Sequence, residues 1–345
     1  MIGLRSASRC LQFSVLATAA FAAIAAPTSL LAFRASAMTS GEPAPLGHDP
    51  LAEAKRCLQD GEADKALALL GSLPTSGIDQ ALAHNIACRV RLTLEQWDAA
   101  ANECDKAVHL EANNSDFHLW LARATGQRAG HASFMNAFSL ARRTRAEFEE
   151  SVRLNPRNAD ALADLGEFYR EAPSVIGGGI DKAQADAAQL DKVDPARAHH
   201  LRADIANGQK DFSTAEREFK QAISSSSHPA LEWTSLASFY RHQNRFDEME
   251  AAVHSAQSGA ARDHHAAVAL FDGAGVLIEA KRDPALAAKM LTDYLASPDK
   301  TEDAPAFVAH LRLARLESQL GDTASAARDR AAALALAHDF KPAKE

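Results

Sequence analysis

The sequence predicts an all-α protein, a right-handed superhelical solenoid of about eight antiparallel helix hairpins. Small residues, with one methionine among them, recur at intervals of 34, 44, 39, 32, 34, 38 and 39 residues, each near the start of an apolar-periodic segment. Beyond the N-terminus no stretch alternates with the period of two that indicates a strand. Intervals of roughly 30 to 45 residues are typical of stacked helical repeats. The recurring residues are Ala66, Ala100, Thr144, Ala183, Ala215, Met249, Ala287 and Ala326.

Residues 1–37 are expected to be a secretory signal peptide. Arg5 and Arg9 precede an uncharged run over residues 11–33, and small residues at 35–37 suit cleavage. The alternative is an uncleaved anchor, because the 23 uncharged residues are long enough to span a bilayer. We therefore expect an exported protein of the periplasm or cell envelope, or one anchored in the inner membrane by residues 11–33.

The predicted repeat array begins after a linker at 38–49 that contains proline and glycine. Asp49 and Pro50 supply an N-cap and a first-turn proline for the first helix. Short polar turns such as Asp60-Gly61 and Asn207-Gly208 make each helix pair antiparallel. The predicted hairpins cover 50–71, 78–110, 114–155, 159–192, 196–224, 229–258, 263–296 and 304–338, followed by a tail at 339–345.

Three cysteines remain in the first two hairpins after cleavage of the signal peptide. An odd number excludes complete internal pairing of Cys57, Cys88 and Cys104. We favour the interpretation that all three are buried as small apolar residues, over a bridge between Cys57 and Cys88. Metal binding is less favoured, because no Cys-x-x-Cys or neighbouring histidine pair accompanies them.

The sixth hairpin carries the clearest repeat signature. Its first helix places apolar and small residues at positions i, i+3, i+4 and i+7, on one helix face. Further copies occur in the other hairpins, and a proline closes one of them. The pattern resembles the tetratricopeptide repeat (TPR) family over residues 50–338. The residues that define it are Ala66, Ala100, Pro156, Gly166, Tyr169, Ala183, Ala215, Trp233, Leu236, Ala237, Tyr240, Ala287 and Ala326.

Residues 117–192 interrupt the regular spacing twice. The third hairpin is long, with a second helix predicted over 134–154, and a loop with Pro173 and Gly177, Gly178 and Gly179 follows the next helix. This stretch resembles a group of exported bacterial TPR proteins with no assigned activity. The glycines lack the lysine, the serine or threonine and the preceding strand of a phosphate-binding loop, which favours a chain reversal.

No residue pattern predicts a reaction, a cofactor or a metal site. The net charge is −8 and the basic residues are spread along the chain, so no nucleic-acid footprint is expected. Adjacent histidines in the pairs His199-His200 and His264-His265 would point about 100° apart on a helix, so neither pair is expected to converge on an ion. Motifs for nucleophilic or metal-assisted catalysis are absent from the sequence. We therefore expect a non-enzymatic protein.

The resemblance implies a concave groove, lined by the first helix of each hairpin, that takes up a peptide or a partner helix. The expected function is a protein–protein interaction scaffold of the bacterial cell envelope. The alternative is a small-molecule or glycan-binding accessory protein that uses the loop at 172–180 and the long third repeat. Self-association through the final helix is also expected, because no capping helix is predicted after it. The candidate groove contacts are Arg89, Glu167, Arg170, His200, Asp204, Asn207, Ser238, Arg241, His242, Asp272 and Arg315.

Overall fold

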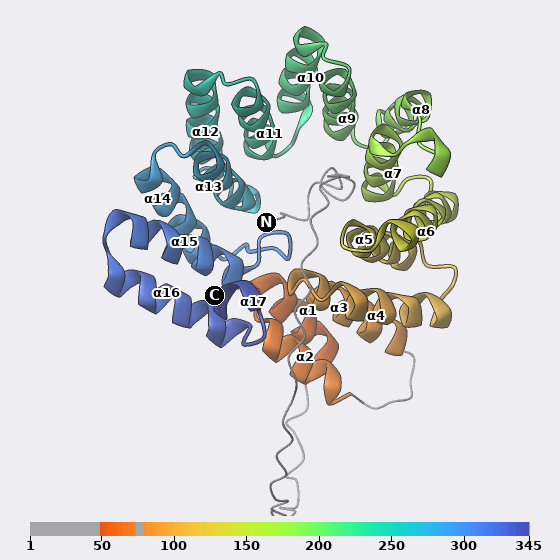
Figure 1. The fold of residues 1–345 in the computed structure, drawn as a ribbon, viewed down its shortest axis with the longest axis horizontal. Coiled ribbons are helices and arrows are strands. Elements are labelled where there is room, and N and C mark those ends of the chain that lie inside the picture. The colour runs from red at the N-terminus through yellow and green to blue at the C-terminus, as the bar shows by residue number, and fades with distance from the viewer. Residues whose placement is uncertain (1–48, 74–78, 345) are drawn as a thin grey trace, which may run out of the picture.

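Eight helix hairpins follow one another around a ring in the computed structural model, which describes residues 49–73 and 79–344 (Figure 1). The predicted signal peptide and nearly all of the predicted linker lie outside the described residues. The hairpins are α1 (Pro50–Asp60) and α2 (Ala63–Gly71), α3 (Gln80–Thr93) and α4 (Trp97–Leu110), α5 (Ser115–Gly130) and α6 (Phe134–Leu154), α7 (Ala159–Glu171) and α8 (Ile180–Leu190), α9 (Pro195–Gly208) and α10 (Phe212–Ser225), α11 (Pro229–His242) and α12 (Phe246–Ala260), α13 (Val268–Ala280) and α14 (Pro284–Ala296), and α15 (Ala306–Leu320) and α16 (Thr323–Leu336).

The helix boundaries follow from local sequence signals. The Asp49 carboxylate accepts a hydrogen bond from the amide of Leu51, and the side chain of Asn114 caps α5 in the same way. Prolines occupy the first turn of α1, α9, α11 and α14, where no intrahelical amide bond is lost. The expected all-α array of helix hairpins is confirmed in the described residues.

The residues that mark the period are the points of closest helix packing. All eight are buried, and six of them have no exposed surface. Thr144 stands at a position where six of the eight recurring residues are alanine. Its hydroxyl donates a hydrogen bond to Thr125 Oγ1 at 3.1 Å, so neither buried hydroxyl lacks a partner. Gly166 is required for a different reason, since a Cβ atom there would overlap the side chain of Leu201 on α9. Of the repeat-defining residues, Trp233 is only partly buried and Pro156 is exposed.

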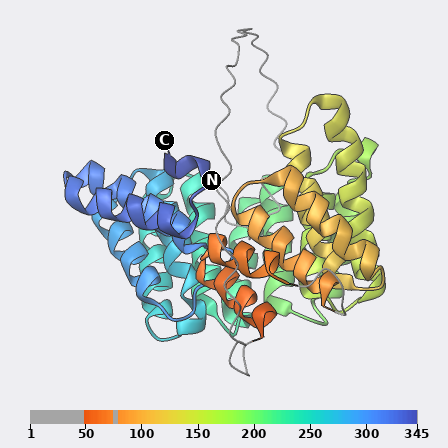
Figure 2. The same cartoon turned by 90° about the horizontal axis from the view of Figure 1, so that it is seen from below.

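The two ends of the array pack against each other, which the sequence did not lead us to expect. Helices of the first and last hairpins share one apolar cluster, and Figure 2 shows them side by side. The ring of Phe340 is buried and lies 4.8 Å from the ring of Phe307. The Arg89 guanidinium on α3 donates to Glu302, on the loop before α15, over 2.8 Å from Nε. The array is therefore closed by its own ends.

Residues predicted to form a tail belong to this closure. A short helix, α17 (Lys341–Lys344), follows Phe340 and buries Ala343 in the shared cluster. The same cluster includes Ala333 and Ala337 at the end of α16, so the first hairpin of the same chain covers this face. The uncovered face that suggested self-association is accordingly occupied within one chain.

One disulfide departs from the prediction for the cysteines. Cys88 on α3 and Cys104 on α4 are bridged, whereas Cys57 is free and buried. The antiparallel helices of one hairpin bring residues 16 apart face to face, a pairing that we did not consider. The expectation of three unbridged cysteines is wrong for two of them, and a Cys57–Cys88 bridge does not form.

The two irregular segments have distinct structures. Helix α6 runs from Phe134 to Leu154 as predicted, and its first residues Phe134 and Met135 are 75% and 79% exposed. The glycine loop contains a 3-10 turn, η2 (Ser174–Ile176), and a left-handed Gly177. In the described residues no helix is both long and apolar enough to cross a membrane.

Candidate functional site

The first helices of the hairpins line the inside of the ring (Figure 1), and each of them carries a stripe of polar residues that are not buried. On α9, Arg197, His200, Asp204 and Asn207 recur at spacings of three or four residues and are at least partly exposed, while Ala198, Leu201, Ala203, Ile205 and Ala206 between them are buried. We call the stripes of the first helices together the inner face. Every one of the eleven predicted groove contacts lies on a first helix, and none of them is buried.

Ion pairs connect the inner face from one first helix to the next. His200 Nδ1 on α9 donates to Glu232 on α11 at 3.0 Å, and Arg241 on α11 contacts Glu279 on α13 at 2.8 Å. Arg123 on α5 donates to Asp164 on α7 at 2.6 Å. Since these pairs bypass the second helices, they bind neighbouring repeats together along the inner face.

The densest part of the inner face is a group on α7, α9 and α11 that we call the inner-face cluster. Arg170 donates to Glu167 at 2.6 Å and to Glu171 at 2.9 Å. His200 lies 3.4 Å from Asp204 through its second ring nitrogen, while its first binds Glu232. The members are Glu167, Arg170, Glu171, His200, Asp204 and Glu232. Four carboxyl groups thus share two bases.

Burial and the neighbouring charges raise the pKa values of three members of the cluster. Burial raises the pKa of Glu171 to about 8, although the neighbouring Arg170 opposes the shift. Burial and the charge of Glu167 raise the pKa of Asp204 to about 7. Burial lowers the pKa of His200, but the hydrogen bond to Glu232 and the charge of Asp204 outweigh it and raise the pKa to about 9. Near pH 7 the cluster therefore holds a charged imidazolium beside carboxyls that change protonation state easily.

The predicted contacts do not all come together. Glu167, Arg170, His200 and Asp204 belong to the inner-face cluster, whereas Arg89 takes part in ring closure with Glu302. Arg315 donates a hydrogen bond to the carbonyl of Pro342, close to the C-terminus. The remaining predicted contacts lie on the inner face outside the cluster: Asn207, Ser238, Arg241, His242 and Asp272.

Sequence reasoning missed two members of the cluster and one aromatic residue. Glu171 and Glu232 were not singled out, although Glu232 lies 32 residues after His200, one repeat length along the chain. Trp120 on α5 lies between two guanidinium groups, with Arg89 at 4.7 Å and Arg123 at 4.5 Å from its ring. Both arginines also bind acids, so Trp120 orients charged groups of the inner face.

The glycine loop uses its backbone amides internally. The amides of Gly177, Gly178 and Gly179 donate to the carbonyls of Ser174, Pro173 and Tyr169 at 2.9, 3.2 and 2.8 Å, respectively. Arg145 on α6 also donates to the carbonyl of Ile176 at 3.1 Å. A row of free amides is what an anion site needs, and these three amides are already engaged.

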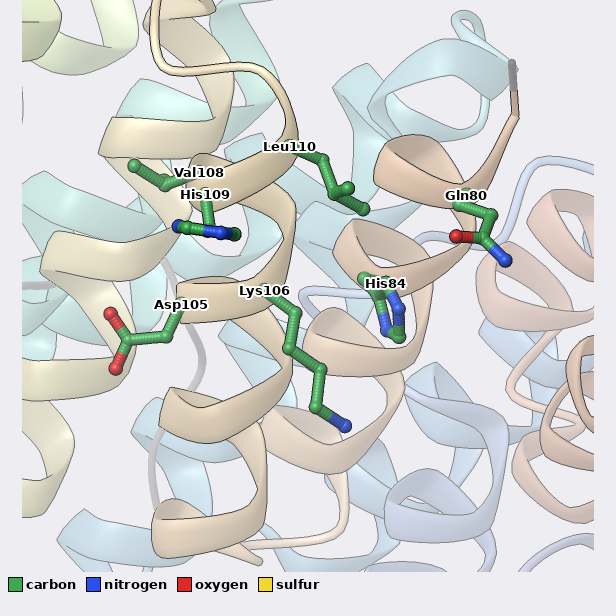
Figure 3. Close-up of a pocket in the computed structure, with 7 residues that line it drawn as sticks. All are labelled: Gln80, His84, Asp105, Lys106, Val108, His109 and Leu110. Atoms are coloured by element: carbon green, nitrogen blue, oxygen red, sulfur yellow. The ribbon is translucent and has the colours of Figure 1, made fainter. Parts of the chain in front are cut away.

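An open hollow of about 610 Å³ lies between α3 and α4, away from the inner-face cluster (Figure 3). His84 and Lys106 both bind Glu103, at 2.6 and 3.0 Å, and Asp105 is bound by Arg143. These polar groups are therefore directed to partners rather than to a common point. The hollow is lined by Gln80, His84, Asp105, Lys106, Val108, His109 and Leu110.

One histidine pair does converge, contrary to our expectation. His264 and His265 lie on a 3-10 turn rather than on an α-helix, and their ring centroids are 4.3 Å apart. Neighbouring side chains are about 120° apart on a 3-10 turn, so the two long side chains themselves, and not the backbone turn, bring the rings together. In the other pair, His199 binds Glu218 and His200 binds Glu232, so these two rings are directed to different partners.

Comparisons with known proteins add similarities of fold only. No model of a protein family matches the chain, and no curated protein matches it. The chain is similar to the solved structure of TTC0263, a thermophilic TPR protein of Thermus thermophilus, with 18% identity and a TM-score of 0.47 over 55% of this chain and 96% of that one. Two structures of MamA match with 18% and 17% identity and TM-scores of 0.38 and 0.36, each over 50% of this chain and over 93% and 92% of MamA. At this level of likeness none of them bears on function.

Proposed function

We propose that this chain is a non-enzymatic protein–protein interaction scaffold of the bacterial cell envelope, and that it binds a peptide or a partner helix along its inner face. The observation that carries the proposal is the continuity of the inner face. Polar and charged side chains from successive first helices lie next to one another and remain accessible to solvent. Such a surface can bind one extended or helical segment at many points.

The chemistry of the inner-face cluster favours a partner that carries positive charge. Its four carboxyl groups outnumber Arg170 and His200, and those of Glu171 and Asp204 have pKa values raised to about 8 and 7. A cationic side chain beside these carboxyl groups would stabilise their ionised forms, and the negative charge of the carboxylates would in turn bind that side chain. We assign no reaction to the cluster, because its acids and bases are directed to one another.

Two observations support export. The N-terminal sequence has the charged, apolar and small-residue order of a signal peptide. The bridge between Cys88 and Cys104 suits an oxidising compartment such as the periplasm. We therefore retain the envelope as the location.

The alternative function, ligand binding at the loop over 172–180, has less support. The amides of its three glycines are engaged, and Lys182 donates to the carbonyl of Gly177 at 2.8 Å. Among the described residues, nothing at this loop points toward a bound small molecule or glycan.

A pull-down from envelope extract tests the proposal. The bait is the full chain, compared with Asn207→Trp and Ser238→Trp, which add bulk to the inner face on α9 and α11 without removing a charge pair. Ser258→Trp is the matched control, because Ser258 is exposed on the second helix α12. We expect the wild type and Ser258→Trp to capture the same protein and the two inner-face variants to lose it.

Two results would overturn the proposal. One is equal capture by all four baits, which would place the contact elsewhere. The other is the absence of any captured protein with the wild type. A variant that lacks residues 173–179 separates the alternative, since loss of capture only in that variant would favour the loop.

A further inference from the structure

Three potential metal ligands from two loops meet near α13 and α15. His264 and His265 lie on the 3-10 turn η3 (His264–Ala266), between α12 and α13. Asp299 lies on the loop between α14 and α15. One ligand atom of each residue lies within 4.8 Å of the ligand atoms of the other two. The set is not a cluster of acids, because it contains two imidazoles and one carboxylate.

The distances between these ligand atoms suit a small transition-metal ion. Asp299 Oδ2 is 3.0 Å from His265 Nδ1 and 3.5 Å from His264 Nε2. Ligands bound tetrahedrally to zinc at about 2.0–2.1 Å lie about 3.3 Å from one another. The two observed distances lie on either side of that value, so a small movement of the side chains would complete the geometry.

A second observation concerns the hydrogen bonding of Asp299. Its Oδ2 atom is buried, yet it has no hydrogen-bond partner among the described residues. The two imidazole nitrogens are close to this atom, but neither bonds to it with hydrogen-bond geometry. The imidazoles form ion pairs with Oδ2 only when they are protonated, and a buried carboxylate oxygen that makes no hydrogen bond is costly, so an ion at this position would explain it.

Both loops are held in place by contacts outside the ligand set. The carboxylate of Asp263 accepts a hydrogen bond from the amide of His265 at 3.1 Å and another from His228 Nδ1 at 2.6 Å. On the other loop, the buried Tyr294 hydroxyl donates to the carbonyl of Ala304 at 2.6 Å and accepts from the amide of Thr301. The ligands therefore start from positions that are largely fixed before an ion binds.

We propose that His264, His265 and Asp299 bind one Zn²⁺ ion or a similar divalent transition-metal ion. Two imidazoles and one carboxylate suit zinc, whereas Mg²⁺ and Ca²⁺ prefer sites made of oxygen ligands alone. Both histidine side chains are 65% exposed, so at least one coordination position stays open to water. The ion connects η3 to the loop that also carries Glu302, the residue that pairs with Arg89 in ring closure.

Zinc titration of the full chain without a polyhistidine tag tests this site. Isothermal titration calorimetry with ZnCl₂ is carried out on the wild type and on His264→Ala, His265→Ala and Asp299→Asn. We expect each variant to bind one ion fewer per chain, or to weaken that binding step by at least about tenfold. His338→Ala is the matched control, because His338 is 69% exposed and also lies beside carboxylates, yet belongs to another part of the surface.

The outcomes are distinguishable from unfolding. Circular dichroism in EDTA tests whether each variant keeps the wild-type helix content. If the other variants unfold, His264→Ala alone still tests the site, because it changes an exposed residue of a turn. Three results would overturn the proposal: no zinc bound by the wild type at 100-fold molar excess, unchanged binding in the three variants, or an equal loss in His338→Ala. Titration with MgCl₂ is expected to show no binding at this site.

Discussion

Truncation of Phe340 tests how much the closure of the ring contributes to stability. Phe340 immediately precedes α17. If this segment were not packed against the first hairpin, substitution of Phe340 would have little effect on stability. In the structure its side chain is 2% exposed and contacts the ring of Phe307 edge to face at 4.8 Å. Phe340→Ala removes this buried ring and leaves a cavity between the first and last repeats.

The expected loss follows from measured core substitutions. Replacing a buried phenylalanine by alanine costs about 3–5 kcal/mol, and an edge-to-face ring contact accounts for roughly 0.5–1.5 kcal/mol of such a loss. We expect a loss of about 3 kcal/mol, at the lower end of that range. Phe134→Ala is the control, since Phe134 is 75% exposed at the start of α6 and its removal is expected to change stability by about 0.5 kcal/mol or less.

Urea unfolding followed by circular dichroism measures the difference in free energy of unfolding. Hydrogen exchange of the amides in α1 accompanies it, because repeat arrays do not always unfold in one step. We expect faster exchange in α1 for Phe340→Ala and unchanged exchange for Phe134→Ala. Equal stability of the two variants, with unchanged exchange in α1, would refute the closure of the ring through Phe340.

Three further predictions concern other parts of the chain. Replacing Cys88 and Cys104 by serine is expected to lower the free energy of unfolding by about 3 kcal/mol, since the bridge closes a loop with a sequence separation of 16; alkylation of both cysteines in the unreduced, denatured wild type would contradict this. The pKa of Glu171 is raised from 4.5 to about 8 in the folded protein, so its bound proton stabilises the fold below pH 4.5. This stabilisation is lost as the pH rises through 8. Between about pH 5 and 8 the free energy of unfolding of Glu171→Gln should therefore fall by about 1–3 kcal/mol less than that of the wild type. Parallel curves of unfolding free energy against pH for the two proteins would disprove this. Gly61→Ala should destabilise more than Gly321→Ala in urea unfolding, because both glycines have left-handed backbones but only a Cβ on Gly61 would meet the backbone of α15; equal losses would count against the closed ring.

The periodic pattern predicted the repeats well because it reports local packing. Ala66, Ala183 and Ala287 were identified from spacing alone and are fully buried where two helices approach closely. Helix α6 and the turn positions followed from apolar periodicity and from glycine, asparagine and aspartate signals. These features depend on residues close together in the sequence.

Ring closure could not be predicted in this way. The pair Arg89 and Glu302 joins residues 213 positions apart, and small changes of angle between repeats decide whether the ends meet. The bridge between Cys88 and Cys104 depends on the rotation of α4 against α3, which the spacing of apolar residues leaves open. The approach of His264 and His265 to Asp299 joins two loops, which the helical pattern does not place relative to one another.

Within the inner face, the sequence predicted the first helices and many of the exposed positions on them. Glu167, Arg170, His200 and Asp204 were predicted from the groove that the family resemblance implies, and the structure brings these four together. Glu232 was missed because its partner lies on another helix. Its importance is visible only once the repeats are stacked.

Closure of the ring is tested most directly by cross-linking its two ends. The His338 ring and backbone amide both bind the carboxylate of Asp64, at 2.7 and 2.8 Å. A chain with Asp64→Cys and His338→Cys is treated with a short bis-maleimide, and the product is digested and analysed by mass spectrometry; Asp64→Cys with Arg217→Cys on α10 is the control. We expect a cross-linked monomer with residues 64 and 338 joined, and no such product in the control. Absence of this product, or cross-links only between separate chains, would contradict a ring closed by its own ends.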